Sequence, residues 1–226
     1  LSGPYGFILD ADQERIVESK WLCFEMEGIM NMPQVVAPIL VYLFHQLEKR
    51  FDGAPTLLIL DEAWLFLDHP LFASKIKDWL KTLRKLNVSV IFAVQSVDDT
   101  LKSDICSALI ESCASRVFLP NDRALEPNIQ ESYQDLGLND RQIQILSNAI
   151  PKMQYYFESS RGNALFDLGL GPIGMALTAV SSPQDKKKLV SLYQKYPEHD
   201  QFINAYLKSC QLEWAIKIIE SRGPRS

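Results

Sequence analysis

Short apolar runs and amphipathic helical patterns alternate along the first half of the chain. Four of the five residues in Thr56–Leu60 are aliphatic, with turn residues before the run and two acids after it. Residues 88–94 form a second β-rich run, and residues 116–119 form a third that ends at Pro120. Runs of this length predict strands, and the first is expected to be buried on both faces.

Helical patterns fill the intervals between these three runs. Apolar residues recur at helical spacing over residues 72–86, and a second helix is expected over residues 103–114. The other face of the first helix carries a row of charges, which most often is only a solvated surface: Lys75, Lys77, Asp78, Lys81, Arg84 and Lys85. The order strand, helix, strand, helix, strand predicts an α/β fold whose sheet is mainly parallel.

The segment before the first run predicts one strand and one helix. Residues 21–26 are apolar enough for a short strand, and residues 33–51 have the pattern of a long helix. Pro38 is compatible with that helix only in or near its first turn, because proline has no backbone N–H to donate.

The second half predicts further elements and a domain boundary. Gly137 ends a short helix, and Asn139 with Gln142 three residues later can cap the next one. Residues 152–158 and 164–168 predict a hairpin, and residues 175–180 a further strand. Ser182 is the expected cap of a helical tail reaching residue 220. We therefore predict an α/β core over residues 1–180 and a helical tail over 181–226.

Composition and charge exclude several classes of protein. Hydrophobic residues make up 47% and charged residues 23%, the balance of a folded globular domain. The longest uncharged apolar run, residues 35–44, is much shorter than a membrane span, and no secretory signal is present. The four cysteines form no CxxC pair, which favours reduced, cytosolic thiols. A net charge of −5 gives no global attraction to nucleic acid, although it allows a local basic groove.

Two acids follow the first predicted strand, in the arrangement called Walker B. Parallel strands deliver their last residues to the carboxyl edge of the sheet, where open α/β folds bind ligands. There Asp61 is predicted to hold Mg²⁺, and Glu62 to orient the water that attacks a phosphoryl group. Alone, four hydrophobic residues before Asp-Glu are a loose pattern that an ordinary strand end can match.

Three further polar residues could belong to the same site. Gln95 follows the second predicted strand, which would place its amide near the same edge, where it could bridge the lytic water or the γ-phosphate. Arg116 begins the third strand and Arg161 lies at the predicted hairpin tip. In ring-shaped motors an arginine of one subunit often completes its neighbour's active site, so either could have that role. Each could equally be a strand-ending glutamine or an arginine in an ordinary salt bridge.

Glycine motifs qualify this hypothesis. The sequence contains no G-x-x-x-x-G-K-[ST], so the loop that cradles the β- and γ-phosphates is absent from it. Residues 169–174 match G-x-G-x-x-G, but a β-rich segment is expected to follow instead of the helix that a dinucleotide site needs. We therefore expect this chain by itself to bind nucleotide poorly.

Several segments, in order along the chain, resemble the TrbE/CagE family of conjugative-transfer ATPases, the VirB-type motors of type IV secretion systems. The resemblance lies in residues 24–26, 38–44, 57–64, 92–96, 116–121 and 165–172. It implies a RecA-like P-loop domain of the HerA and FtsK group, with Asp61 and Glu62 as the Walker B acids, Gln95 as the post-strand glutamine, and Arg116 and Arg161 at the later arginine positions. The family's first core strand and phosphate-binding loop would lie before Leu1.

The resemblance also implies a cellular role. It suggests a hexamer that uses ATP and Mg²⁺, lies peripherally on the cytoplasmic side of the bacterial inner membrane, works with other type IV secretion components, and exports a protein or nucleoprotein substrate. Two alternatives stay open: a non-catalytic assembly or docking module, and a DNA translocase of the same superfamily that binds DNA directly. The acidic net charge ranks the translocase below protein secretion.

Overall fold

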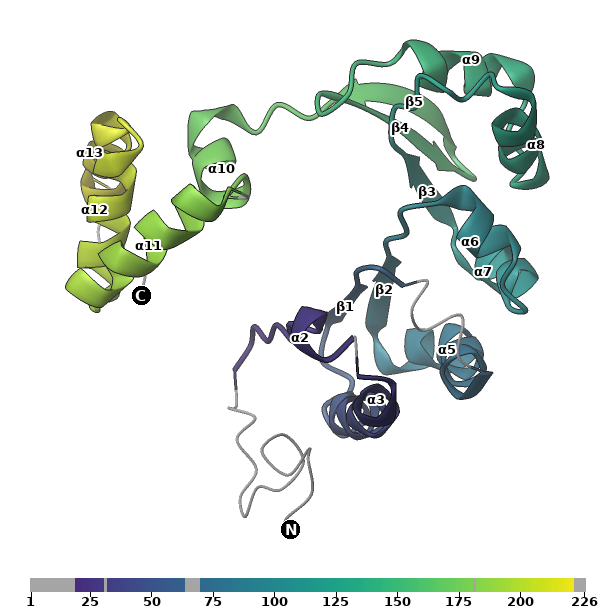
Figure 1. Ribbon diagram of the computed structural model, residues 1–226, viewed down its shortest axis with the longest axis horizontal. Coiled ribbons are helices and arrows are strands. Elements are labelled where there is room, and N and C mark those ends of the chain that lie inside the picture. The colour runs from purple at the N-terminus through teal and green to yellow at the C-terminus, as the bar shows by residue number, and fades with distance from the viewer. Residues whose placement is uncertain (1–18, 31, 64–69, 181, 222–226) are drawn as a thin grey trace. The chain divides into compact units, whose positions relative to one another are not determined.

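The computed structural model describes residues 19–30, 32–63, 70–180 and 182–221 (Figure 1). These residues form two compact units. The first contains the described residues up to Ala114 together with residues 132–137, and the second contains residues 115–131 and the described residues from Leu138 onward. The two units are described separately.

A parallel pair of strands forms the centre of the first unit. β1 (Thr56–Leu60) pairs with β2 (Val88–Phe92), with Leu60 opposite Phe92. Two helices pack against this pair, α3 (Pro33–Glu48) and α5 (Pro70–Thr82), the latter continued by the 3₁₀ turn η1 (Leu83–Leu86) (Figure 1). The predicted strand–helix–strand unit is confirmed, including its parallel pairing.

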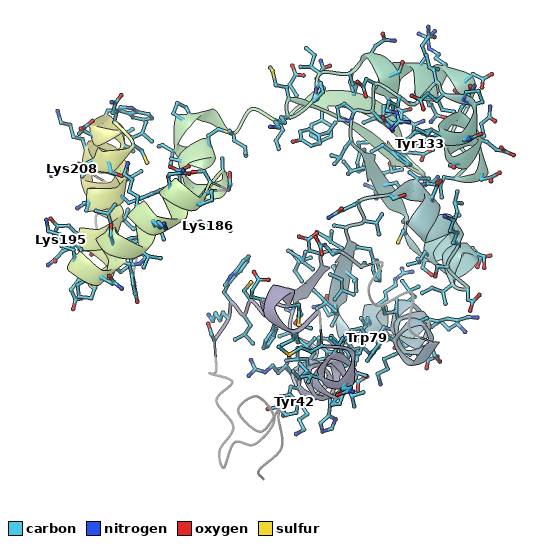
Figure 2. The ribbon with its side chains drawn as sticks, in the orientation of Figure 1. Tyr42, Trp79, Tyr133, Lys186, Lys195 and Lys208 are labelled. Carbon is cyan, nitrogen blue, oxygen red and sulfur yellow. The ribbon has the colours of Figure 1, made fainter. Side chains whose placement is uncertain are left out.

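Aromatic rings join the two helices of this unit. The Trp79 ring lies 4.7 Å from that of Phe44 and 5.9 Å from that of Phe51, and its indole N–H donates to Glu48 at 2.8 Å (Figure 2). Ile76 on the same helix is fully buried. The apolar face predicted for residues 72–86 is therefore the face that packs into the core.

Only one face of the strand pair is covered by the described residues. Leu58 and Leu60 are buried, whereas Leu57 and Ile59 are 57% and 49% exposed. The prediction that this strand is buried on both faces is wrong for the described chain, because α3 and α5 pack against the same side. Alternate residues of a strand point to opposite faces, so the second aliphatic set lies bare.

Three further expectations for this unit are corrected. Residues 21–26 form no strand and lead instead into the short helix α2 (Glu27–Met30), since no described strand is placed to pair with them. Pro38 lies in the second turn of α3, where buried Val35 and Leu40 hold the helix although one backbone hydrogen bond is lost. The helix expected over residues 103–114 is the shorter α7 (Cys106–Ser112), preceded by α6 (Val97–Leu101).

An antiparallel sheet forms part of the second unit. Its strand order is β3 (Ser115–Phe118), β4 (Gln154–Ser159) and β5 (Gly162–Asp167). The predicted hairpin is confirmed, but β3 does not extend the parallel sheet as expected. Adjacent strands along a chain need not pair, and β3 finds its hydrogen bonds on β4, with Arg116 opposite Glu158.

Two short helices accompany the antiparallel sheet in the sequence. α8 (Pro127–Asp135) is followed by Gly137 at φ +92°, a left-handed conformation that favours glycine. α9 (Asp140–Asn148) begins with the predicted capping box, in which Asn139 and Gln142 exchange side-chain and backbone hydrogen bonds. Ile143 and Leu146 of α9 are fully buried. The sequence-based expectations for this segment are confirmed.

The last four helices form a small helical cluster. α10 (Gly171–Thr178) is followed by α11 (Pro183–Lys195), α12 (His199–Ser209) and α13 (Glu213–Ser221). Ser182 caps α11 as predicted, accepting from the Asp185 amide. The strand predicted at residues 175–180 is wrong: residues of α10 pack on the later helices, and Tyr206 donates to the Ala176 carbonyl. The boundary between residues 180 and 181 stays a prediction.

Candidate functional site

The ends of the two parallel strands lie next to each other and stay hydrogen-bonded beyond the strands. The Ala93 amide donates to the Leu60 carbonyl at 3.0 Å, and the Ala63 amide donates to the Ala93 carbonyl at 2.9 Å. These bonds fix the backbone on either side of the two acids that follow β1. The loop after β2 is thereby held beside them.

Glu62 and Gln95 meet at this edge. The Gln95 side-chain amide donates to Glu62 Oε1 at 2.9 Å, although the residues are 33 positions apart in the sequence. Both side chains are exposed. The predicted proximity of the two strand ends is therefore present, and it takes the form of a direct hydrogen bond.

Glu62 has an unusual backbone conformation. Its φ is +50°, in the left-handed region that non-glycine residues seldom adopt. The Glu62 amide donates to Asp61 Oδ1 at 3.0 Å, which helps to hold this conformation. Such backbone strain costs about 1–3 kcal/mol and occurs often at functional sites. The turn aims the second acid differently from a residue that continues the strand.

The Asp61 and Glu62 carboxylates fit a site for a hydrated divalent cation shared with phosphates. Asp61 is exposed, and its contact with the Glu62 amide uses one carboxylate oxygen. Within the described ranges no three His, Cys, Asp or Glu side chains gather as a cluster that could hold a metal. Mg²⁺ commonly takes one or two protein carboxylates and completes its shell with water and substrate phosphates.

Arg116 belongs to the second unit and is held by its neighbours there. Its guanidinium lies 2.9 Å from Glu158 Oε2, as an ion pair and not a well-aligned hydrogen bond. It also lies 6.0 Å from the centre of the Phe118 ring. Glu158 in turn receives the Gln142 amide at 3.5 Å, and Gln142 donates to the Tyr156 hydroxyl at 3.0 Å. Arg116 is thus one member of a largely buried polar network.

Arg161, on the same unit, has different surroundings. It lies in the two-residue turn between β4 and β5, its side chain is exposed, and its backbone amide donates to Ser159 Oγ. No acid within the described residues pairs with it. The structure therefore gathers Asp61, Glu62 and Gln95 in the first unit, while the two arginines belong to the second.

Sequence reasoning missed the residues that hold Arg116. Glu158 is opposite Arg116 in the antiparallel register, and Gln142 reaches it from α9. Nothing in the spacing of these residues announces the contact, because it depends on which strand β3 pairs with. Gln142 gave one signal as a helix cap, but not as a buried side chain with a second role.

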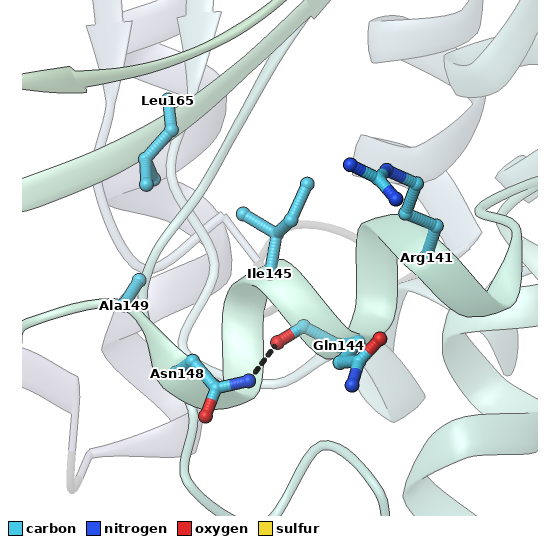
Figure 3. A pocket seen from close by; sticks show the side chains of 6 residues that line it. All are labelled: Arg141, Gln144, Ile145, Asn148, Ala149 and Leu165. Atoms are coloured by element: carbon cyan, nitrogen blue, oxygen red, sulfur yellow. Dashed lines mark hydrogen bonds between the residues drawn. The ribbon is translucent and has the colours of Figure 1, made fainter.

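A shallow hollow is present elsewhere in the second unit (Figure 3). It is lined by residues of α9 and β5, including Arg141, Ile145 and Leu165, and the Asn148 amide donates to the Gln144 carbonyl oxygen beside it. It contains none of the predicted site residues. It offers one cationic side chain and no convergent set of polar groups, so it carries no functional argument.

The G-x-G-x-x-G match at residues 169–174 receives a corrected explanation. A helix, α10, does begin inside it at Gly171, contrary to the expected strand. However, the preceding strand β5 is part of an antiparallel hairpin, and α10 is followed by α11 in place of a parallel strand. A dinucleotide site needs the strand–helix–strand unit, so this interpretation is still disfavoured, for a different reason.

Comparison with known proteins gives a consistent relationship. The family model described as the TraG P-loop domain matches residues 1–158. The chain is 45% identical over 197 residues to the conjugal transfer protein TrbE of Rhizobium radiobacter, covering 87% of this chain and 24% of that protein. It is 43% identical to a probable conjugal transfer protein TrbE of Sinorhizobium fredii, covering 87% of this chain and 30% of that protein.

More distant relatives agree. The type IV secretion system protein virB4 of Bartonella henselae is 25% identical over 189 residues, which cover 82% of this chain and 24% of that protein. The solved structure of VirB4 of Thermoanaerobacter pseudethanolicus matches with a TM-score of 0.50 at 22% identity, covering 61% of this chain and 36% of that one. The α/β fold class and the P-loop relationship are confirmed. The chain spans less than a third of the length of these TrbE and virB4 proteins.

Proposed function

Because the chain belongs to the TraG P-loop domain family and is of the TrbE and VirB4 type, we propose that it supplies the acidic half of an ATP-hydrolysis site in a type IV secretion motor. The observation that carries this proposal is the 2.9 Å hydrogen bond between Gln95 and Glu62 at adjacent strand ends. A chance pair of acids after a strand has no reason to be met by an amide from the next parallel strand. The phosphate-binding loop would come from a longer form of the protein.

Each polar side chain has a separate role in this proposal. Asp61 holds Mg²⁺, which when bound neutralises charge on the β- and γ-phosphates of ATP. Glu62 accepts a hydrogen bond from the attacking water and orients it. Gln95 positions the Glu62 carboxylate with one amide hydrogen, leaving its second N–H and its carbonyl oxygen for the water or the γ-phosphate. This arrangement couples the end of β2 to the state of the nucleotide.

Arg161 is the better candidate for the arginine that enters a neighbouring subunit's site. An exposed arginine in a tight turn, without an acid partner in the described chain, can reach a phosphate at little cost. Arg116 would have to leave Glu158, which would then keep a buried charge without its ion-pair partner. We therefore assign the trans role to Arg161 and a structural role to Arg116.

The cellular setting follows the relatives. TrbE is named as a conjugal transfer protein and virB4 as a type IV secretion system protein. We propose that the parent protein acts as a hexamer with other secretion components, peripherally at the inner face of the bacterial inner membrane, on a protein or nucleoprotein substrate. No helix among the described residues combines the length and apolarity needed to span a bilayer.

The test compares ATP hydrolysis by this chain with that of a longer protein extended along its relatives to include G-x-x-x-x-G-K-[ST]. The longer protein should turn over, and Glu62→Gln should reduce kcat by about 10²–10⁴-fold with little change in KM, because the lost group acts on the water. Glu111→Gln is the matched control, since Glu111 is an exposed acid of α7 in the same unit. It should leave kcat unchanged.

A mixing experiment tests the assignment of the arginines. Proteins carrying only Arg161→Ala or only Glu62→Gln should each be inactive, and mixing them should restore part of the activity at interfaces where an intact Arg161 meets an intact Glu62. Arg116→Ala should instead lower stability. An inert longer protein, or a Glu62→Gln variant with normal kcat, would favour a non-catalytic assembly module.

A further inference from the structure

The outer face of α5 and η1 carries a row of exposed cations that the proposed ATPase chemistry does not use. We call the residues Lys77, Lys81, Arg84 and Lys85 the α5 basic face. All four side chains are exposed. They lie at positions i, i+4, i+7 and i+8, which is one side of a helix.

The α5 basic face is opposite the face that packs into the core. The inward residues Phe72, Ile76, Trp79 and Leu83 are all buried. The cations therefore project from the side of the helix that the core does not use. From Lys77 to Lys85 the row extends for about 12 Å along the axis, at about 1.5 Å per residue.

These cations are not neutralised by nearby acids. Lys75, one turn earlier, forms an ion pair with Glu48. By contrast, no Asp or Glu in the described ranges forms a salt bridge with any member of the α5 basic face. Between residues 75 and 85 the chain has five cations and one acid, Asp78, a local charge of +4 in a protein whose net charge is −5. Such a concentration is not explained by the overall composition.

We propose that the α5 basic face binds the phosphate backbone of a nucleic-acid strand without reading its bases. Side chains that contact phosphates are mainly Arg and Lys, assisted by Ser and Thr hydroxyls. Ser74, which is exposed one turn before Lys77 and Asp78, can supply such a hydroxyl. A row of four cations about 12 Å long can span a few consecutive phosphates of one strand.

Two other anionic partners fit less well. A helix that lies on a lipid surface inserts an apolar face into the headgroup region, whereas the apolar face of α5 is already buried in the core. Protein interfaces are enriched in aromatic residues and depleted in lysine at their centres, whereas this face is lysine-rich and has no exposed aromatic side chain among its members. Phosphates in a strand need only the charges.

The α5 basic face does not depend on the nucleotide site, so its test does not require ATP hydrolysis. Binding of a fluorescein-labelled single-stranded oligonucleotide to the 226-residue chain would be followed by anisotropy over a range of salt concentrations. Four phosphate contacts predict that log K falls with log salt with a slope of about −2.8, at about 0.7 per contact. The double variant Lys81→Glu with Arg84→Glu should bind at least tenfold more weakly at low salt, with a shallower slope.

A matched variant separates local from global charge. Lys186→Glu with Lys195→Glu makes the same change in net charge on exposed lysines of α11 (Figure 2) and should retain most of the binding. Circular dichroism should show both double variants folded. The proposal is overturned if the oligonucleotide does not bind at low salt, or if the two double variants lose affinity equally. It is also overturned if vesicles of phosphatidylserine or a poly-glutamate peptide bind this face more tightly than the oligonucleotide does.

Discussion

Two glutamates of this chain are each approached by a glutamine amide, yet their surroundings differ. Glu62 lies at the edge of the parallel pair, exposed, with Gln95 at 2.9 Å. Glu158 lies within the antiparallel sheet with a 16% exposed side chain, beside Gln142 at 3.5 Å and the Arg116 guanidinium at 2.9 Å. One carboxylate keeps lone pairs open to solvent, and the other uses its charge on an internal cation.

This difference separates a group available for chemistry from a group that holds the fold. A carboxylate that orients water must keep an accessible oxygen and must not be neutralised by a permanent cation. A carboxylate in a mostly buried site must have its charge paired, since an unpaired buried charge is expensive. The same glutamine–glutamate contact therefore positions a side chain at one site and completes a network at the other.

The largest expected effect tests whether the two regions have separate cores. Ile76 in the first unit and Ile143 in the second are both fully buried. Ile76→Ala and Ile143→Ala should each lower the free energy of unfolding by about 2–5 kcal/mol, because each leaves a cavity. Hydrogen exchange read by mass spectrometry should show the loss of protection mainly in the unit that carries the substitution. Equal loss in both units would mean that they unfold together.

The next effect compares the two glutamates directly. Glu158→Ala should reduce the free energy of unfolding by about 1–3 kcal/mol, because Arg116 and Gln142 lose their shared partner inside the sheet. Glu62→Ala should change it by less than about 0.5 kcal/mol, as is usual for exposed positions. Urea denaturation of the two variants measures the contrast. If Glu158→Ala is as harmless as Glu62→Ala, the network is not structural.

The contrast also explains how far the sequence could lead. The carboxyl edge of the parallel pair follows from local patterns, because a short aliphatic strand must deliver Asp61 and Glu62 to the same edge as Gln95. The Glu158–Arg116 pair depends on β3 joining an antiparallel sheet, a choice made by long-range pairing that neither segment encodes alone. The same limit explains the wrong strand at residues 175–180, whose apolar pattern suits either a strand or a helix buried by α12 and α13.

A smaller effect concerns the helix that presents Gln142 to Glu158. Asn139 caps α9 by accepting from the Gln142 backbone amide at 3.0 Å, and the Gln142 side chain receives the Asn139 amide in return. Asn139→Ala should lower the free energy of unfolding by about 1 kcal/mol, within the usual range for lost caps. Asn139→Asp, which keeps an acceptor at the N-terminus of the helix, is the control and should retain most of the stability. Thermal unfolding followed by circular dichroism compares the two variants.

The smallest effect involves Glu48, a carboxylate intermediate between the other two, whose side chain is 35% exposed. Partial burial raises its pKa, but hydrogen bonds from Lys75 and Trp79 outweigh burial, and the net pKa is below the ordinary value. A carboxyl with a lower pKa in the folded state stabilises the fold above its unfolded pKa of about 4.3, and that contribution is lost as the pH falls through the folded value.

Glu48→Gln should therefore destabilise the protein by less than about 1 kcal/mol at neutral pH, since solvent screens so exposed a pair. The Gln side-chain carbonyl can still accept from the Trp79 indole, so the substitution removes mainly the charge shared with Lys75. Urea unfolding of both proteins at neutral pH and at about pH 3 measures the difference, which should narrow on acidification because the wild-type carboxyl also becomes neutral. A difference that stays constant between the two pH values would assign the effect to altered packing around Trp79, and would place Glu48 with the structural carboxylate Glu158.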